Sequence, residues 1–232
     1  MRIKILYEDS NILAIDKPSG VLVHSDSRSK EETIQDYFLK KYPKLEIVHR
    51  LDKETSGVLL LAKNKKAHEF LKKQFVNREI KKIYHAIVVG NVKKDHEIIN
   101  KPIGRSPKDF RRRLSGRGVR GELREAITEY KVLKRFIDKK DKFTYLEIKP
   151  KTGRTHQIRV HMKYLNHPVV GDVLYNPKGL PLPNLPLRKG GEKREGRMML
   201  HAKSIEFKNL KGKTIKVESA LPKEFQKIAP TI

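Results

Sequence analysis

The densest run of charged and polar residues between apolar stretches is His49–Gly57, and it contains one carboxylate placed to do chemistry. Asp52 lies between Arg50 and Lys53, and nearby cations favour the ionised form of a carboxyl group. The apolar run Val58–Ala62 follows at once and predicts a strand. An ionised carboxylate at a strand edge suits a nucleophile or a base; the alternative is a turn in which the aspartate only caps the backbone.

A second cluster, Lys151–Met162, follows a predicted strand and opens a predicted helix, so its backbone N–H groups could face a phosphate or a carboxylate. Arg154 and Arg159 lie five residues apart and cannot share one helix face squarely. One of them could therefore face a polyanion while the other turns inward, where its fork of donors could hold a carboxylate. The alternative is an ordinary cationic helix start.

Tyr84 lies in a strand-like run, Lys81–Val89. Its default role is half-buried packing, although an aromatic ring beside cations can also stack on an unpaired base. The chain has no cysteine, which excludes disulfides, thiolate nucleophiles and thiolate metal sites. Three histidines near the second cluster match no zinc spacing, so no metal is expected: His156, His161 and His167.

Charge indicates the class of partner. The 232 residues include 53 Lys and Arg but only 27 Asp and Glu, which gives a formal net charge of +26. Such an excess favours nucleic acid over a surface tuned only for solubility, because each cation placed on a phosphate releases counterions. The N-terminal region has no apolar stretch long enough for a signal peptide, and no run could span a bilayer. We therefore expect a cytoplasmic protein with no membrane partner.

The elements that must position these residues are mostly short strands. Apolar runs bounded by turn residues predict strands at Ile3–Tyr7, Ile12–Ile15, Val58–Ala62, Ile83–Val89, Ala126–Leu133 and Phe143–Ile148. Helical spacing predicts helices over residues 34–42, over 67–75 with Asn64 as the N-cap, and over 155–165. Strands outnumber helices, so the predicted fold is α+β: a mixed, largely antiparallel central sheet flanked by helices and loops.

Two basic segments, 101–122 and 176–197, show little periodicity and are predicted to be surface loops. Loops longer than a dozen residues in a compact domain are usually functional or disordered. Because of their charge we expect both to contact RNA, and the first contains the triplet Arg111, Arg112 and Arg113. No clean linker is visible, so residues 1–232 are predicted to form a single domain.

Taken in order, these segments resemble the RluA-type pseudouridine synthases. The resemblance rests on HRLDKETSGVLLLAKN from His49, REIKKIYHAIVVG from Arg78, TGRTHQIRVHM from Thr152 and RMMLHA from Arg197. It covers roughly residues 7–207 and implies the catalytic fold of that family. Many relatives also carry a small N-terminal RNA-binding domain; no such separate domain is expected in this chain, which leaves RNA binding to its own basic surface.

The resemblance implies an isomerase that detaches a uracil, turns it and rejoins it to ribose through a ring carbon. Asp52 would be the essential carboxylate, with Arg159 paired to it, and Tyr84 would contact the uracil and could help remove the ring-carbon proton. Leu200 would give an apolar wall near the base. Arg50 would fill the gap left by a flipped nucleotide. Because nothing is added or lost in the reaction, no cofactor and no metal are expected.

The RNA-binding residues expected beside this site are Arg154 and His156 of the third motif. The expected partner is structured RNA, either ribosomal or transfer RNA, with no obligate protein partner and a monomeric state. Sequence does not choose the RNA, the uridine, or a covalent over a base mechanism for Asp52. Two alternatives remain: a non-catalytic RNA-binding protein that retains this fold, and a nuclease using Asp52 and a histidine.

Overall fold

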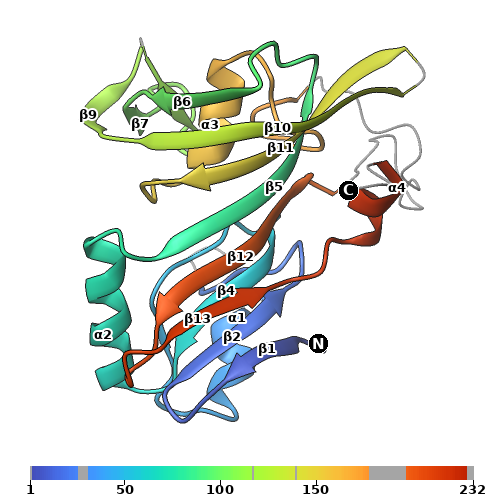
Figure 1. The fold of residues 1–232 in the computed structure, drawn as a ribbon. Helices are drawn as coiled ribbons and strands as arrows, with labels where there is room; N and C mark the ends of the chain where they lie inside the picture. The colour runs from blue at the N-terminus through green and yellow to red at the C-terminus, as the bar shows by residue number, and fades with distance from the viewer. Residues whose placement is uncertain (1, 26–30, 117, 139, 178–196, 229–232) are drawn as a thin grey trace. The chain divides into compact units, whose positions relative to one another are not determined.

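The computed structural model describes residues 2–25, 31–116, 118–138, 140–177 and 197–228 (Figure 1). The chain forms two compact units, where the sequence predicts a single domain. Unit 1 consists of Met1–Ile83 and His201–Ala220, and unit 2 of Tyr84–Leu200 and Leu221–Ile232. Two of the three boundaries between the units fall within strands β5 (Lys81–Val89) and β12 (Leu200–Lys208), and the third lies between Ala220 and Leu221. The two units are described separately.

Unit 1 is built on a sheet with the strand order β1-β2-β4-β12. Two further strands join it, because β13 pairs with β12 and β3 pairs with β4. The bounds are β1 (Lys4–Glu8), β2 (Ile12–Lys17), β3 (Glu46–Ile47), β4 (Ser56–Ala62) and β13 (Thr214–Glu218). Every residue of β4 is buried, which explains the unbroken apolar run in its sequence. The β4–β12 pairing is parallel, and the other pairings in this unit are antiparallel.

Both helices of unit 1 begin at capping residues. In α1 (Ile34–Leu39), the side chains of Thr33 and Asp36 form a reciprocal capping box. In α2 (Lys65–Val76), the side-chain oxygen Oδ1 of Asn64 accepts a hydrogen bond from the Ala67 N–H at 2.9 Å. The N-cap predicted at Asn64 is therefore confirmed. The apolar side of α2 packs on the buried cluster of β2, β4 and β12.

Gly57 allows β4 and β12 to approach closely. Its φ of +109° belongs to a region that L side chains rarely adopt. A Cβ atom there would lie 2.2 Å from the backbone oxygen of Ala202. Only glycine therefore fits at the start of this strand, directly after the segment that contains Asp52.

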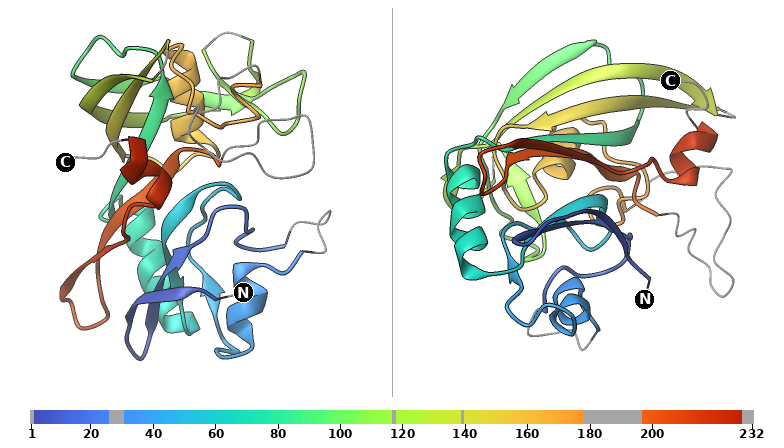
Figure 2. Two further views of the ribbon diagram at one scale, coloured as in Figure 1. Left: turned by 90° about the vertical axis from the view of Figure 1, so that its right-hand side faces the viewer. Right: turned by 60° about the horizontal axis from the view of Figure 1, so that its bottom comes forward.

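Unit 2 contains a second antiparallel ladder with the order β5-β11-β10-β6. The other strands of this ladder are β6 (His96–Asn100), β10 (Ile127–Asp138) and β11 (Asp141–Pro150). The long β10–β11 hairpin is curved (Figure 2). Helix α3 (Gln157–Tyr164) contributes Ile158 and Met162 to the buried cluster of this ladder. Helix α4 (Lys223–Ile228) places Phe225 in a neighbouring cluster.

A separate three-stranded sheet in unit 2 corrects the loop predicted over 101–122. Its order is β8-β7-β9, with bounds β7 (Ile103–Arg105), β8 (Arg113–Ser115) and β9 (Arg120–Arg124). These strands are short and rich in arginine and glycine, so they lack the alternation that predicts a strand. Of the other predicted loop, 176–197, residues 178–196 lie outside the described residues. The predicted class, α+β with largely antiparallel pairing, is confirmed.

Candidate active site

Asp52 lies in a tight turn immediately before β4, and its side chain is partly buried. Its backbone oxygen accepts a hydrogen bond from the Thr55 N–H at 3.1 Å, which closes the turn. Lys53, in the turn itself, points its ammonium toward Glu31 at 2.7 Å. The carboxylate is thus mounted on a short turn and anchored by a fully buried strand, which limits its movement.

Lys17, at the end of β2, fixes this turn from the other side. Its side chain is fully buried, and its ammonium donates hydrogen bonds of 2.7–2.9 Å to the backbone oxygens of Pro18, Val21 and Lys53. The Gly20 N–H donates to the same Lys53 oxygen at 2.9 Å. One buried charge therefore joins the segment after β2 to the turn that contains Asp52. Lys17 was not predicted from the sequence, in which the available signal is a lysine that ends an apolar strand before Pro-Ser-Gly.

His49 precedes the turn and is held as a neutral ring. Its Nε2 accepts a hydrogen bond from the Leu60 N–H at 2.9 Å, and its ring lies 4.9 Å from that of Phe75. Burial, and secondarily the charge of Lys82, lower the pKa of His49 to about 3. The next residue, Arg50, is exposed, with one guanidinium nitrogen 3.4 Å from the His24 ring. The chain thus passes from a partly buried histidine, held by a hydrogen bond, to an exposed cation just before Asp52.

The last motif of the sequence, RMMLHA, also reaches this turn within unit 1. His201 and Ser56 pair across the parallel β4–β12 ladder, with Nδ1 and Oγ 2.8 Å apart and both side chains buried. The hydrogen bond fixes the first residue of β4, four positions after Asp52. Two distant motifs therefore support the same short segment.

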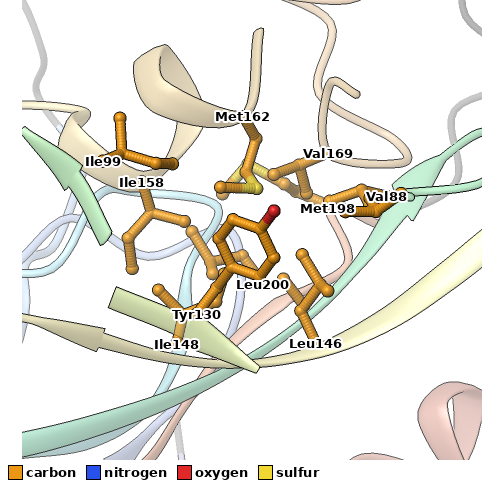
Figure 3. Close-up of a cluster of buried hydrophobic side chains, with 12 residues drawn as sticks. Val88, Ile99, Tyr130, Leu146, Ile148, Ile158, Met162, Val169, Met198 and Leu200 are labelled. Atoms are coloured by element: carbon orange, nitrogen blue, oxygen red, sulfur yellow. The ribbon is translucent and has the colours of Figure 1, made fainter. Parts of the chain in front are cut away.

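In unit 2 the structure brings Tyr84 and Leu200 to one apolar cluster. Leu200 is 3% exposed and belongs to the buried core of the β5-β11-β10-β6 ladder (Figure 3). Tyr84, on β5, is half-buried and packs against the same cluster. The cluster also contains Met162 and Ile158 from α3, next to Arg159. An aromatic ring on an apolar surface can contact a flat base.

Arg159 turns inward from α3 and forks a carboxylate. Its Nε and Nη2 donate to the two oxygens of Asp172 at 2.7 and 2.9 Å, and both side chains are buried. Asp172 Oδ1, the oxygen that accepts from Arg159 Nη2, also accepts hydrogen bonds from the backbone N–H groups of Leu174 and Tyr175, each at 3.0 Å. The bidentate geometry fixes the plane of the guanidinium as well as its position. Asp172 was not singled out from sequence, although it lies in the HPVVGDVLY stretch.

Tyr175 completes the support of this guanidinium. Its ring centroid lies 5.0 Å from the Arg159 guanidinium carbon, within the range of a cation–π contact. Its hydroxyl accepts a hydrogen bond from the Arg113 N–H at 2.8 Å and lies 3.0 Å from Nδ1 of His156. His156 itself takes a left-handed conformation, with φ of 58°, at the start of α3. One tyrosine thus connects the helix start, the inward arginine and strand β8.

Arg154 is partly exposed, and its side chain donates to the backbone oxygen of Glu125 at 2.8 Å. Of the predicted basic triplet, Arg111 and Arg112 lie between β7 and β8, and Arg113 is the first residue of β8. Arg111 is exposed and forks Asp109, whereas Arg113 donates to the backbone oxygens of Phe110 and Arg112. All the residues expected to bind RNA through the third motif and the basic triplet therefore belong to unit 2.

Two further properties bear on the chemistry. Among the described residues, no group of three His, Cys, Asp or Glu side chains is arranged to hold a metal ion. No helix in the described part of the chain is long and apolar enough to cross a membrane. The candidate residues described above are a carboxylate on a fixed turn in unit 1, and an aromatic ring and a buried guanidinium in unit 2.

Comparison with known proteins identifies the family. Residues 11–164 match the family described as RNA pseudouridylate synthase. An uncharacterized RNA pseudouridine synthase of Aquifex aeolicus (strain VF5) is 43% identical over 199 residues, which cover 82% of this chain and 61% of that protein. The ribosomal large subunit pseudouridine synthase D of Borreliella burgdorferi is 38% identical over 234 residues, or 96% of this chain and 66% of that protein.

Solved structures agree with this. Human RNA pseudouridylate synthase domain containing 1 superposes with a TM-score of 0.77 and 29% identity, covering 95% of this chain and 84% of that one. The chain spans about three fifths to two thirds of the length of the two curated relatives described above. The matched region contains Asp52, Tyr84 and Arg159. By this match, by the relatives and by the fold, the chain belongs to the RNA pseudouridylate synthase family and is of the RluA type.

Proposed function

We propose that this protein isomerises uridine to pseudouridine in structured RNA, with Asp52 as the catalytic carboxylate. The observation that carries the proposal is the turn that holds Asp52. It lies within the family match and is fixed by a closing hydrogen bond, by buried Lys17 and by the fully buried strand β4. Fixing a reactive group in advance reduces the entropic cost of reaching the transition state.

The other proposed roles are those that the resemblance to the RluA-type enzymes implies. Tyr84 stacks on the uracil and helps to remove the ring-carbon proton in the last step. The resemblance implies that Arg159, which forks Asp172 in this structure, also pairs with Asp52 in the reacting enzyme, and that Leu200 gives the base an apolar wall. Arg50, which is exposed, enters the RNA stack in place of the flipped nucleotide. Whether Asp52 forms a covalent adduct or acts as a base toward the sugar is open in this proposal.

The RNA is held by positive charge outside the site. We assign this binding to Arg154 and His156 at the start of α3 and to the basic segment with Arg111, Arg112 and Arg113. The reaction needs neither cofactor nor metal. The proposed protein is a cytoplasmic monomer without an obligate protein partner.

Ribosomal RNA is the first substrate to test, because the second relative described above is named for the ribosomal large subunit. Transfer RNA is the second. Within either molecule we expect targets in loops and at stem ends, where a nucleotide flips at lower cost than inside a duplex.

The deciding experiment is release of tritium from ring carbon five of uracil in unmodified ribosomal and transfer RNA transcripts, tested separately. Wild type should release tritium. Asp52→Asn should release none yet bind the same RNA with nearly unchanged affinity, because one carboxylate contributes little to phosphate binding. Tight binding without release by wild type would support a non-catalytic RNA-binding protein, and shortened RNA would support a nuclease.

A further inference from the structure

The small β8-β7-β9 sheet places three arginines in one row across its strands. Arg105 on β7 is the direct partner of Arg113 on β8 and of Arg120 on β9. Directly opposed residues of antiparallel strands project from the same face, with Cβ atoms about 4.5–5.5 Å apart. Arg113, Arg105 and Arg120 therefore form an arginine row on one face of this sheet.

This arrangement opposes the stability of the sheet itself. Like charges directly opposite each other on adjacent strands are destabilising. Neighbouring arginines are neutralised locally, since Arg111 forks Asp109 and Arg124 pairs with Glu122. Arg105 and Arg120 are exposed, and within the described residues neither forms an ion pair. A row of like charges without counter-charges is what a polyanion would stabilise.

The row is held rigidly. Ile103, two residues before Arg105, is buried in a cluster with Ala126, Val160 and Tyr175, and this anchors β7. The Tyr175 hydroxyl accepts the Arg113 N–H at 2.8 Å and so fixes β8. The positions of the three arginines are therefore set by the core of unit 2 and not by a free loop.

The opposite face of the sheet is occupied at the same point. A Cβ atom on Gly104 would lie 2.1 Å from a methyl carbon of Val119, so this valine covers the other side of β7. Glycine at position 104 leaves the room that Val119 occupies. Arg105 projects from the opposite side of β7, where Arg105 and Arg120 are exposed.

We propose that the arginine row binds successive phosphates of one RNA strand. The inference rests on the proposed function for the identity of the polyanion. Guanidinium groups fork phosphate oxygens, and a row repeated at the strand spacing of about 4.8 Å presents them in a line. The bound phosphates cancel the repulsion within the row. Arg105 and Arg120 thus contribute more to RNA binding than Arg111, which Asp109 already neutralises.

The test is the salt dependence of binding of the full chain to an unmodified transcript of bacterial large-subunit ribosomal RNA. The variants are Arg105→Gln and Arg120→Gln, with Arg124→Gln as the control of equal charge change, because Arg124 is exposed and already pairs with Glu122. Each row variant should flatten the slope of log affinity against log salt by about 0.7, the value for one lost phosphate contact on a single strand. The control should lose less than half of that.

Arg105→Lys distinguishes charge from damage to the sheet. It keeps the charge and should keep the slope of wild type, although its affinity falls because a lysine cannot fork a phosphate. A slope unchanged by Arg105→Gln and Arg120→Gln, or one lost equally in Arg105→Lys, would overturn the proposal.

Tritium release at saturating RNA separates the two proposals. The row variants should keep the kcat of wild type while KM rises. If wild type releases tritium but the slopes do not change, the arginine row is refuted and the proposed function stands. If wild type releases none and the slopes fall as expected, the row binds RNA and the catalytic proposal fails.

Discussion

Replacing the carboxylate that forks Arg159 tests the architecture of unit 2. Asp172→Asn keeps the shape of the side chain but removes its charge and places an amide N–H₂ group where an oxygen accepted a hydrogen bond. The Arg159 side chain is 8% exposed and that of Asp172 is 0% exposed, so water cannot replace the lost oxygen. The guanidinium would remain buried without this counter-charge.

The expected cost follows from that burial. Removing one partner of a buried ion pair destabilises a protein by about 3–5 kcal/mol, because the other charge stays desolvated. For a chain of this size the same change lowers the melting temperature by roughly 6–20 °C. Asp172 also accepts two backbone hydrogen bonds, so the segment around Leu174 and Tyr175 should loosen with it.

The assay is urea and thermal unfolding of the full chain, and unit 2 itself supplies the control. Asp109 forks Arg111 with the same bidentate geometry, but on the exposed surface. Exposed pairs contribute little because water and salt screen them, so Asp109→Asn should barely move the unfolding midpoint. Equal shifts for Asp172→Asn and Asp109→Asn, or no shift for Asp172→Asn, would refute the reasoning from burial.

Two further predictions concern unit 1. Lys17→Met should leave three backbone oxygens without their shared donor, so the Gly20 and Thr55 amides should exchange hydrogen faster than in wild type; unchanged exchange would mean that Lys17 does not hold the turn. The pKa of His49 is lowered to about 3 from 6.5, so between these values the unfolded chain binds a proton that the folded chain does not. Stability from this group is complete above about pH 6.5 and is lost as pH falls toward 3. His49→Asn should flatten the stability of the protein in that pH window, and an unchanged pH profile would remove His49 as its cause.

The order of apolar residues was sufficient to predict an element where the buried residues of that element follow its periodicity. The run Val58–Ala62 predicted a strand, and β4 is buried throughout. The helix after Asn64 was predicted from its spacing and its cap, and both are present. The apolar side chains of both elements pack in one buried cluster. The order of apolar residues along the chain is therefore enough to predict them.

Local pattern failed where pairing depended on distant partners. Strands β7, β8 and β9 carry arginine and glycine in place of alternating apolar residues, and their pairing depends on Ile103 and Tyr175 reaching a core built by other segments. Strand β13 was also missed, since it pairs only with β12 near the other end of unit 1's sheet. Such strands form because neighbouring strands pair with them, and their own alternation of apolar and polar residues is too weak to predict a strand.

The sequence by itself determined the class of fold, the excess of positive charge and the motifs that name Asp52, Tyr84 and Arg159. These depend on residue type and order, which are visible before folding. Only the tertiary structure decided which charges are buried and what they touch: Lys17 on the turn of Asp52 and Asp172 on Arg159. Lys17 reaches a backbone oxygen 36 residues away and Arg159 a carboxylate 13 residues away, and no local periodicity encodes contacts that the fold alone brings within 3 Å.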